Sequence, residues 1–213
     1  MKTQMSIHRG LAEVKTYDNR IVRATQQLFV TANKKSNEKI KGVLIDDIKK
    51  TIQGNFDSVK ALIENKKVIK AAIVLSNATT TIEVGGNTYT VAEAIERKNM
   101  IALEENLLNQ LVGQLKNANS TVENENAKLP EKLETYLQSI LGEKDKRTVE
   151  DIESHTKAFY SRNEYELVDP CGIQKHIDRL YDEITKFKTE VDYKLSESNS
   201  LTMIEVDLVG DDI

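Results

Sequence analysis

The chain has 213 residues and a formal net charge of −4, and its Lys and Arg residues are scattered among Asp and Glu without forming a basic block. This distribution disfavours duplex nucleic acid as a partner, because binding to duplex phosphates requires a concentrated cationic surface. Charged residues make up 30% of the chain and aromatic residues 5%, with only 9 Gly and 2 Pro, a composition that favours long amphipathic helices over an aromatic-rich β-sandwich.

The single cysteine, Cys171, cannot form an intramolecular disulfide, and the first residues lack the apolar run of a signal peptide. Both features predict a reducing, cytoplasmic setting. The longest strongly apolar run, residues 71–75, is far shorter than the roughly 20 residues that cross a bilayer. No membrane partner is therefore expected.

The first elements in chain order are predicted to be helices. Apolar residues at three- and four-residue steps indicate a helix over about residues 5–31. A polar stretch at residues 33–37 predicts a loop, in which Ser36 can cap a second helix that runs to about Leu75. Gly54 lowers helix propensity by about 1 kcal/mol relative to alanine, so this segment forms either one helix or two shorter ones.

A β-hairpin is predicted next, because β-branched and aromatic residues lie on both sides of Gly85-Gly86-Asn87. Thr90, followed three residues later by Glu93, is the pattern of a capping box and predicts the start of a third long helix. This helix is expected to fade at about residues 117–120. Residues 117–147 are polar and are predicted to be an insertion or a flexible arm.

Two more helix starts follow in the sequence. Thr148 with Asp151 predicts a short helix that ends near residue 160. Asp169 as N-cap and Pro170 as the first helical residue predict the last long helix.

The apolar residues of the last helix, over residues 173–195, step by three or four as in a coiled coil. Residues 201–208 alternate at strand period and predict a terminal strand or extended arm, which can pair with the 79–90 hairpin or with another subunit. Residues 209–213 are expected to be a disordered tail. Together the patterns predict one mainly α domain of long antiparallel amphipathic helices, with one small hairpin and a C-terminal strand, that assembles as a homo-oligomer.

Short stretches at the hairpin, before the last helix and within it carry a resemblance to a known family. They are Ser76-Asn77, residues 86–95, Arg97-Lys98, Tyr160-Ser161-Arg162, Tyr165, Asp178-Arg179-Leu180 and Asn199. In them the chain resembles the septicolysin-like family of small helical bacterial proteins of uncharacterised function. It departs from the family pattern at Asn99 and Ser200. The resemblance implies a helical fold with a hairpin and self-association, and it implies no activity.

Catalytic and metal-binding patterns are weak. Cys171 lies at the first turn of a predicted helix, where the helix dipole can lower the pKa of a thiol, but nearby Asp169 opposes this effect. The three histidines are isolated, and Asp151 with His155 is one pair at helical spacing, which is too few ligands for a metal site. No enzyme activity, metal or cofactor is therefore expected.

A possible ligand site is indicated by polar residues that gather where regular structure is interrupted. Arginines, hydroxyls and tyrosines near a helix N-terminus can hold a phosphate without chemistry. The predicted ligand-binding residues are Asn77, Tyr89, Thr90, Arg97, Lys98, Tyr160, Ser161, Arg162, Tyr165 and Arg179. The alternative interpretation is that these residues only cap helices and join them by hydrogen bonds.

Two functions are consistent with these patterns, with a pore-forming toxin as a distant third. The first is a non-catalytic oligomer that captures a small phosphate-bearing ligand, for example a nucleotide signal, as a counter-defence factor of a mobile element. The second is a structural or adaptor protein whose helices bind another protein. Positive pockets lined by Arg97, Lys98, Arg162 or Arg179 favour the first function, and an exposed apolar groove favours the second.

Overall fold

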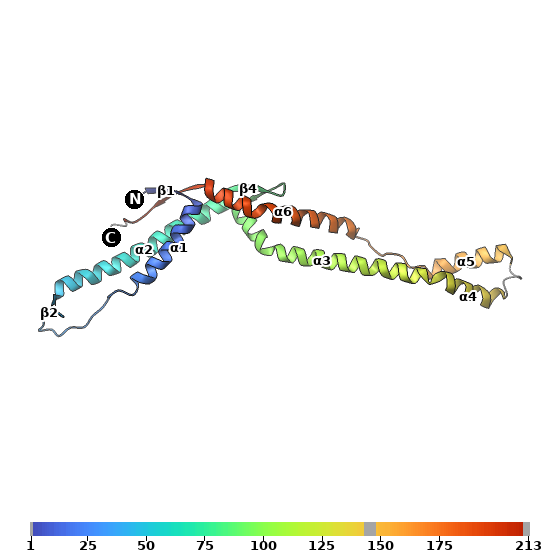
Figure 1. Cartoon of the computed structure of the whole chain (residues 1–213), viewed down its shortest axis with the longest axis horizontal. Coiled ribbons are helices and arrows are strands. Elements are labelled where there is room, and N and C mark those ends of the chain that lie inside the picture. The colour runs from blue at the N-terminus through green and yellow to red at the C-terminus, as the bar shows by residue number, and fades with distance from the viewer. Residues whose placement is uncertain (1, 143–147, 211–213) are drawn as a thin grey trace. The chain divides into compact units, whose positions relative to one another are not determined.

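The computed structural model describes residues 2–142 and 148–210, and most of these residues are helical (Figure 1). The elements are β1 (Lys2–Ser6), α1 (Ile7–Ala24), β2 (Lys39–Ile40), β3 (Val43–Leu44), α2 (Ile45–Thr79), β4 (Thr81–Val84), β5 (Asn87–Thr90), α3 (Val91–Ala127), α4 (Leu129–Leu141), α5 (Val149–Asn163), α6 (Ile173–Leu201) and β6 (Met203–Asp207). The predicted mainly α fold with a hairpin and a C-terminal strand is confirmed.

The chain divides into two compact units, where the sequence analysis expected one domain. Unit 1 comprises Met1–Asn99 and Lys186–Ile213, and unit 2 comprises Met100–Thr185. Helices α3 and α6 therefore each contribute residues to both units. Each unit is described by itself below.

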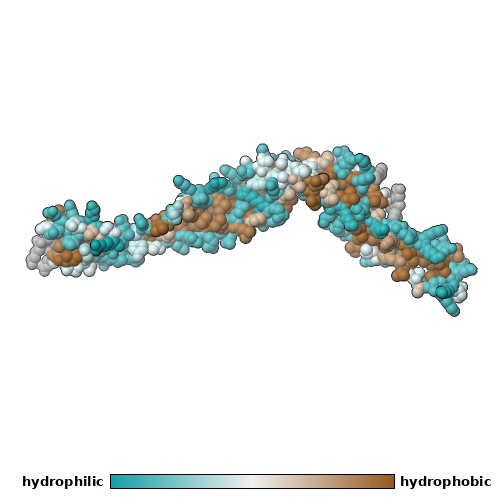
Figure 2. Space-filling model, turned by 180° about the vertical axis from the view of Figure 1, so that it is seen from behind, coloured by the Kyte–Doolittle hydropathy of each residue, from teal (hydrophilic) through white to brown (hydrophobic). Residues whose placement is uncertain are grey.

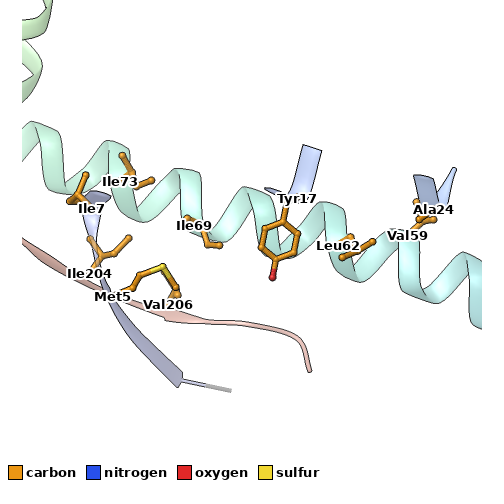
Figure 3. Packing of buried hydrophobic residues seen from close by; sticks show 10 residues of the cluster. All are labelled: Met5, Ile7, Tyr17, Ala24, Val59, Leu62, Ile69, Ile73, Ile204 and Val206. Atoms are coloured by element: carbon orange, nitrogen blue, oxygen red, sulfur yellow. The ribbon is translucent and has the colours of Figure 1, made fainter. Parts of the chain in front are cut away.

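The core of unit 1 lies between the antiparallel helices α1 and α2 and the small sheet of β1 and β6 (Figure 3). Its buried residues are Met5, Ile7, Tyr17, Ala24, Val59, Leu62, Ile69, Ile73, Ile204 and Val206. Gly10 allows the close approach of α1, because a Cβ atom there would lie 3.3 Å from Cδ1 of Ile73 and 3.4 Å from Cδ1 of Ile204. One apolar cluster thus joins the two ends of the chain.

The predicted terminal strand is present as β6, but its partner differs from both expected partners. β6 pairs antiparallel with β1, with Lys2 opposite Asp207 and Ser6 opposite Met203, whereas β4 and β5 of the hairpin pair with each other. The prediction that the strand joins the hairpin is therefore wrong, and the predicted first helix begins at Ile7 because the preceding residues belong to β1. The hydroxyl of Ser6 caps this helix by accepting a hydrogen bond from the Arg9 amide at 3.2 Å.

Helix α2 runs without interruption through Gly54, which selects the single-helix alternative. It begins at Ile45, after the short β2–β3 ladder, and Ser36 is not its cap. The penalty of about 1 kcal/mol for an internal glycine is small compared with the burial of the α2 side chains from Val59 to Ile73.

The described part of the predicted irregular arm is helical. α3 continues to Ala127, and Pro130 lies at the start of α4, where its missing N–H breaks no helical hydrogen bond. Helices α4 and α5 pack through aromatic side chains, because the ring centroids of Tyr136 and Phe159 lie 5.2 Å apart. Residues 143–147 of the predicted arm lie outside the described residues.

The last helix begins later than expected. α6 starts at Ile173, after Gly172 with a φ of +66°, and Asp169 still caps it because its Oδ2 accepts a hydrogen bond from the Ile173 amide at 2.8 Å. Val209, in the predicted disordered tail, donates its amide to Oδ1 of Asn65 at 2.7 Å. Residues 211–213 of that tail lie outside the described residues.

Candidate functional sites at the hairpin and along α3

The β4–β5 hairpin closes with a two-residue turn at Gly85 and Gly86, whose φ angles are +60° and +80°. Two positive φ angles match the twist that a tight hairpin needs, and only glycine adopts them without strain. The predicted hairpin turn is therefore explained by the backbone. The turn packs closely on α6, since a Cβ atom at Gly85 would lie 3.3 Å from the Phe187 amide nitrogen.

The predicted capping box forms where the hairpin leads into α3. Oε2 of Glu93 accepts a hydrogen bond from the Thr90 amide at 2.7 Å, and Oγ1 of Thr90 accepts one from the Glu93 amide at 3.1 Å. The Thr90 backbone amide, followed by its hydroxyl, lowers the pKa of the Glu93 carboxyl below its ordinary value of 4.5. A carboxylate of the chain itself therefore occupies the anion-binding end of α3.

Arg97 and Tyr89, two of the predicted ligand-binding residues, contact each other directly. Nη1 of half-buried Arg97 donates a hydrogen bond to the Tyr89 hydroxyl. Its guanidinium carbon lies 4.6 Å from the ring centroid of Phe187 on α6, and the Phe187 and Tyr89 rings meet edge to face at 5.8 Å. Arg97 is therefore held in a cation–π contact with a buried ring.

Carboxylates of α6 engage two further donors at this junction. Lys98 forms an ion pair with Asp192, and Oε2 of Glu190 accepts a hydrogen bond from the Gly85 amide at 2.8 Å. Asn77, also predicted for this site, is half-buried in the last turn of α2. The Lys98 ammonium and the Gly85 amide are thus both engaged by carboxylates of unit 1.

The other predicted ligand-binding residues belong to unit 2 and do not form one cluster within it. They are Tyr160, Ser161 and Arg162 near the end of α5, Tyr165 in the segment after it, and Arg179 in α6. The Ser161 hydroxyl donates to the Ala158 carbonyl at 3.0 Å, and Arg162 and Tyr165 are exposed. In Figure 1 the first turns of α6 run beside α3. Helix α5 lies farther along, next to α4.

Unit 2 has grooves between α3 and the first turns of α6, one mainly apolar and one more polar. One groove of about 390 Å³ is lined by Leu107, Leu111, Cys171, Ile173, His176, Arg179, Leu180 and Glu183. Another groove, of about 520 Å³, has a more polar lining: Val112, Leu115, Lys116, Asn119, Ser120, Glu123, Gln174 and Ile177. The guanidinium of Arg179 at the rim of the first groove is paired with Glu183, with Nε 2.7 Å from Oε1.

Next to the first groove, α3 exposes a row of large apolar side chains. Met100, Leu103 and Leu107 are 55%, 66% and 53% exposed. We call these three residues the α3 face. Figure 2 shows an apolar patch over the parts of α3 and α6 that belong to unit 2.

Sequence reasoning missed three features of the structure. Phe187 belongs to the predicted apolar series of the last helix, but its contact with Arg97 depends on tertiary structure. The α3 face was missed although its residues are spaced three and four apart, a signal that the sequence contains. A small groove of about 210 Å³ in unit 1, lined partly by Arg20 and Arg23, was also not expected.

Comparisons with protein-family models, with curated proteins and with solved structures give no match to this chain. They neither support nor refute the resemblance to septicolysin-like proteins. Over residues 2–142 and 148–210, no helix combines the length and the apolar character needed to cross a membrane. In the same residues, no three His, Cys, Asp or Glu side chains gather into a group that could hold a metal ion.

Proposed function

We propose that this chain is a non-catalytic structural or adaptor protein that binds protein chains through the apolar side of its helices. The α3 face supports this proposal, because three large apolar side chains follow one another along a helix and more than half of each is exposed. A helix surface of this kind, beside an apolar groove with a polar rim, has the anatomy of a protein-binding surface.

The hairpin gives less support to anion capture by unit 1. Glu93 accepts from the Thr90 amide just before α3, Asp192 pairs with Lys98, and Glu190 accepts from the Gly85 amide. A phosphate there would have to displace carboxylates that already satisfy these donors. An exposed apolar groove, in contrast, is the feature that favours the adaptor function.

Capture of a small phosphate-bearing ligand is the second candidate, and Arg179 is the residue that favours it. Arg179 and His176 both line the groove of about 390 Å³ beside α3. A phosphate would compete with Glu183 for the Arg179 guanidinium. A thermal-shift screen of the purified protein against linear and cyclic nucleotides tests this candidate, with Arg179→Ala expected to abolish any shift.

A photo-crosslinking amino acid placed at Leu103 tests the adaptor proposal in the cells that produce the protein. We expect irradiation to join position 103 to a protein chain, because the exposed leucine lies in the proposed contact. The matched control is the same amino acid at Leu75 of α2, a helical leucine with a similar exposure of 68%. If position 103 gives no more protein adduct than position 75, the proposal is wrong.

A further inference from the structure

Helix α3 carries more apolar surface than one neighbouring helix can cover. Successive residues of an α-helix are rotated by about 100° about its axis. Viewed down that axis, the apolar side chains of α3 cover roughly half of the circumference, with Leu103 at one edge and Val112 at the other. An apolar stripe that packs on one neighbour is about 100° wide. The first turns of α6 lie along the side of α3 that carries Leu111 and Leu115, and the α3 face lies to one side of that contact.

The chain exposes more surface than compact proteins of its size, which leaves area for a contact with another subunit. The chain exposes 15410 Å², whereas compact proteins of the sizes of unit 1 and unit 2, counted separately, would together expose about 12,000 Å². Counting the two units separately gives a larger reference area than counting one compact protein of the same mass, so this choice does not inflate the surplus. A surplus on the order of 3,000 Å² per chain exceeds the roughly 1,000–2,500 Å² that each subunit buries in a permanent interface.

The composition of this part of α3 favours a contact between identical surfaces. From Asn99 to Leu115 the only charged residues are Glu104 and Glu105, and both are half-buried and already have partners. Uncharged amides, such as Asn106 and Gln110, lie among the apolar residues instead. An amide group both donates and accepts hydrogen bonds, so a surface with amides and without charge can face its own copy without like-charge repulsion.

We propose that a second copy of this chain covers the α3 face, with Met100, Leu103 and Leu107 of the two copies packed against each other across a two-fold axis. This inference rests on the proposed protein-binding function and names the partner. The contact does not use the 173–195 series of α6, whose spacing resembles a coiled coil. Within the 173–195 series of α6, Ile177, Ile184, Phe187 and Val191 are buried in their own chain.

The mass of the full chain in solution, measured by light scattering at micromolar concentration, tests this inference. The native chain should have the mass of a dimer. Leu103→Glu and Leu103→Lys should each weaken the dimer at least about a hundredfold, because each would bury unpaired charges in an apolar contact. Mixing the two variants should restore a dimer, since Glu then faces Lys across the axis. Leu75→Glu, at the matched exposed position of α2, should leave the dimer intact.

A cross-link measures the same contact without disrupting it. Leu103→Cys in a Cys171→Ser background should give a disulfide-linked dimer on mild oxidation, whereas Leu75→Cys in that background should not. A monomeric native chain, a Leu103→Glu variant with native dimer affinity, or a mixture of charge variants that stays monomeric would overturn the inference. If the chain is monomeric but photo-crosslinks at position 103 to another protein, this inference fails and the adaptor function survives. If position 103 joins no protein at all, both fail.

Discussion

At the scale of single residues, two asparagines hold main-chain segments in the same way. The side chain of Asn65, which is 1% exposed, donates to the Val209 carbonyl at 3.0 Å and accepts from the Val209 amide at 2.7 Å. Asn126 makes the corresponding pair of bonds to the main chain of Tyr165, at 2.9 Å and 2.8 Å. Each amide side chain therefore makes the pair of hydrogen bonds that a neighbouring β-strand would make to the same residue.

The two asparagines differ in burial, and this predicts different effects of their removal. Asn65→Ala should lower the free energy of unfolding by about 2 kcal/mol, because it removes two hydrogen bonds from a buried position and leaves a gap. Asn126→Ala should cost about 1 kcal/mol or less, since the groups it frees are exposed to water. Urea denaturation of both variants measures the difference, and a larger loss for Asn126→Ala would contradict this account.

The two turn glycines of the hairpin allow a second comparison. Both have positive φ, so alanine at either position strains the backbone by about 1 kcal/mol. At Gly85 the new methyl group would also lie 3.2 Å from Lys186 Cβ and 3.3 Å from the Phe187 amide nitrogen, whereas Gly86 has open space around it. Gly85→Ala should therefore destabilise the protein by about 1–3 kcal/mol more than Gly86→Ala. Equal losses in thermal denaturation would show that the turn does not pack on α6.

At the scale of elements, the start of α3 predicts a dependence on pH. The folded pKa of Glu93 is lowered by the Thr90 amide and hydroxyl, so its stabilising contribution is present above the ordinary value of 4.5 and is lost as the pH falls through the folded pKa. NMR titration should show a lowered pKa that rises only in part in Thr90→Val, because the backbone amide remains. Glu93→Gln should lose less stability on acidification than the native chain. A Glu93 carboxyl that titrates at its ordinary pKa would exclude the capping box in solution.

Element types could be predicted from the sequence where the signal is local. The hairpin and the caps at Thr90 and Thr148 each depend on residues within three or four positions, and all three are confirmed. β1 could not be predicted, because its partner β6 lies about 200 positions away and the residues of β1 themselves show no strand pattern. The Asn-rich end of α3 has low helix propensity, yet it is helical, with half-buried Val122 and the Asn126 contact to hold it.

In the candidate hairpin site, the sequence predicts the cations and hydroxyls but not the groups that they contact. The sequence predicts ligand binding by Tyr89, Arg97 and Lys98, because cations and hydroxyls cluster around them. Their partners Phe187 and Asp192 are about 90 positions away on α6, and no local pattern reveals which carboxylates will neutralise a cation. A sequence can therefore indicate that a region is rich in polar donors without showing which acceptors the fold brings to them.

At the scale of the whole molecule, the surplus of exposed area links stability to concentration. If two copies cover each other's α3 face, dimerisation stabilises the folded chain by mass action, and a hundredfold rise in concentration adds about 2.7 kcal/mol per dimer. The Tm should then rise by a few degrees over that range. Leu103→Glu should show a lower Tm that does not change with concentration, and Leu75→Glu should keep the native dependence. Circular dichroism at two protein concentrations measures all three chains. If the native chain has the mass of a monomer and its Tm does not change with concentration, the apolar side of α3 is stable in water without a second copy.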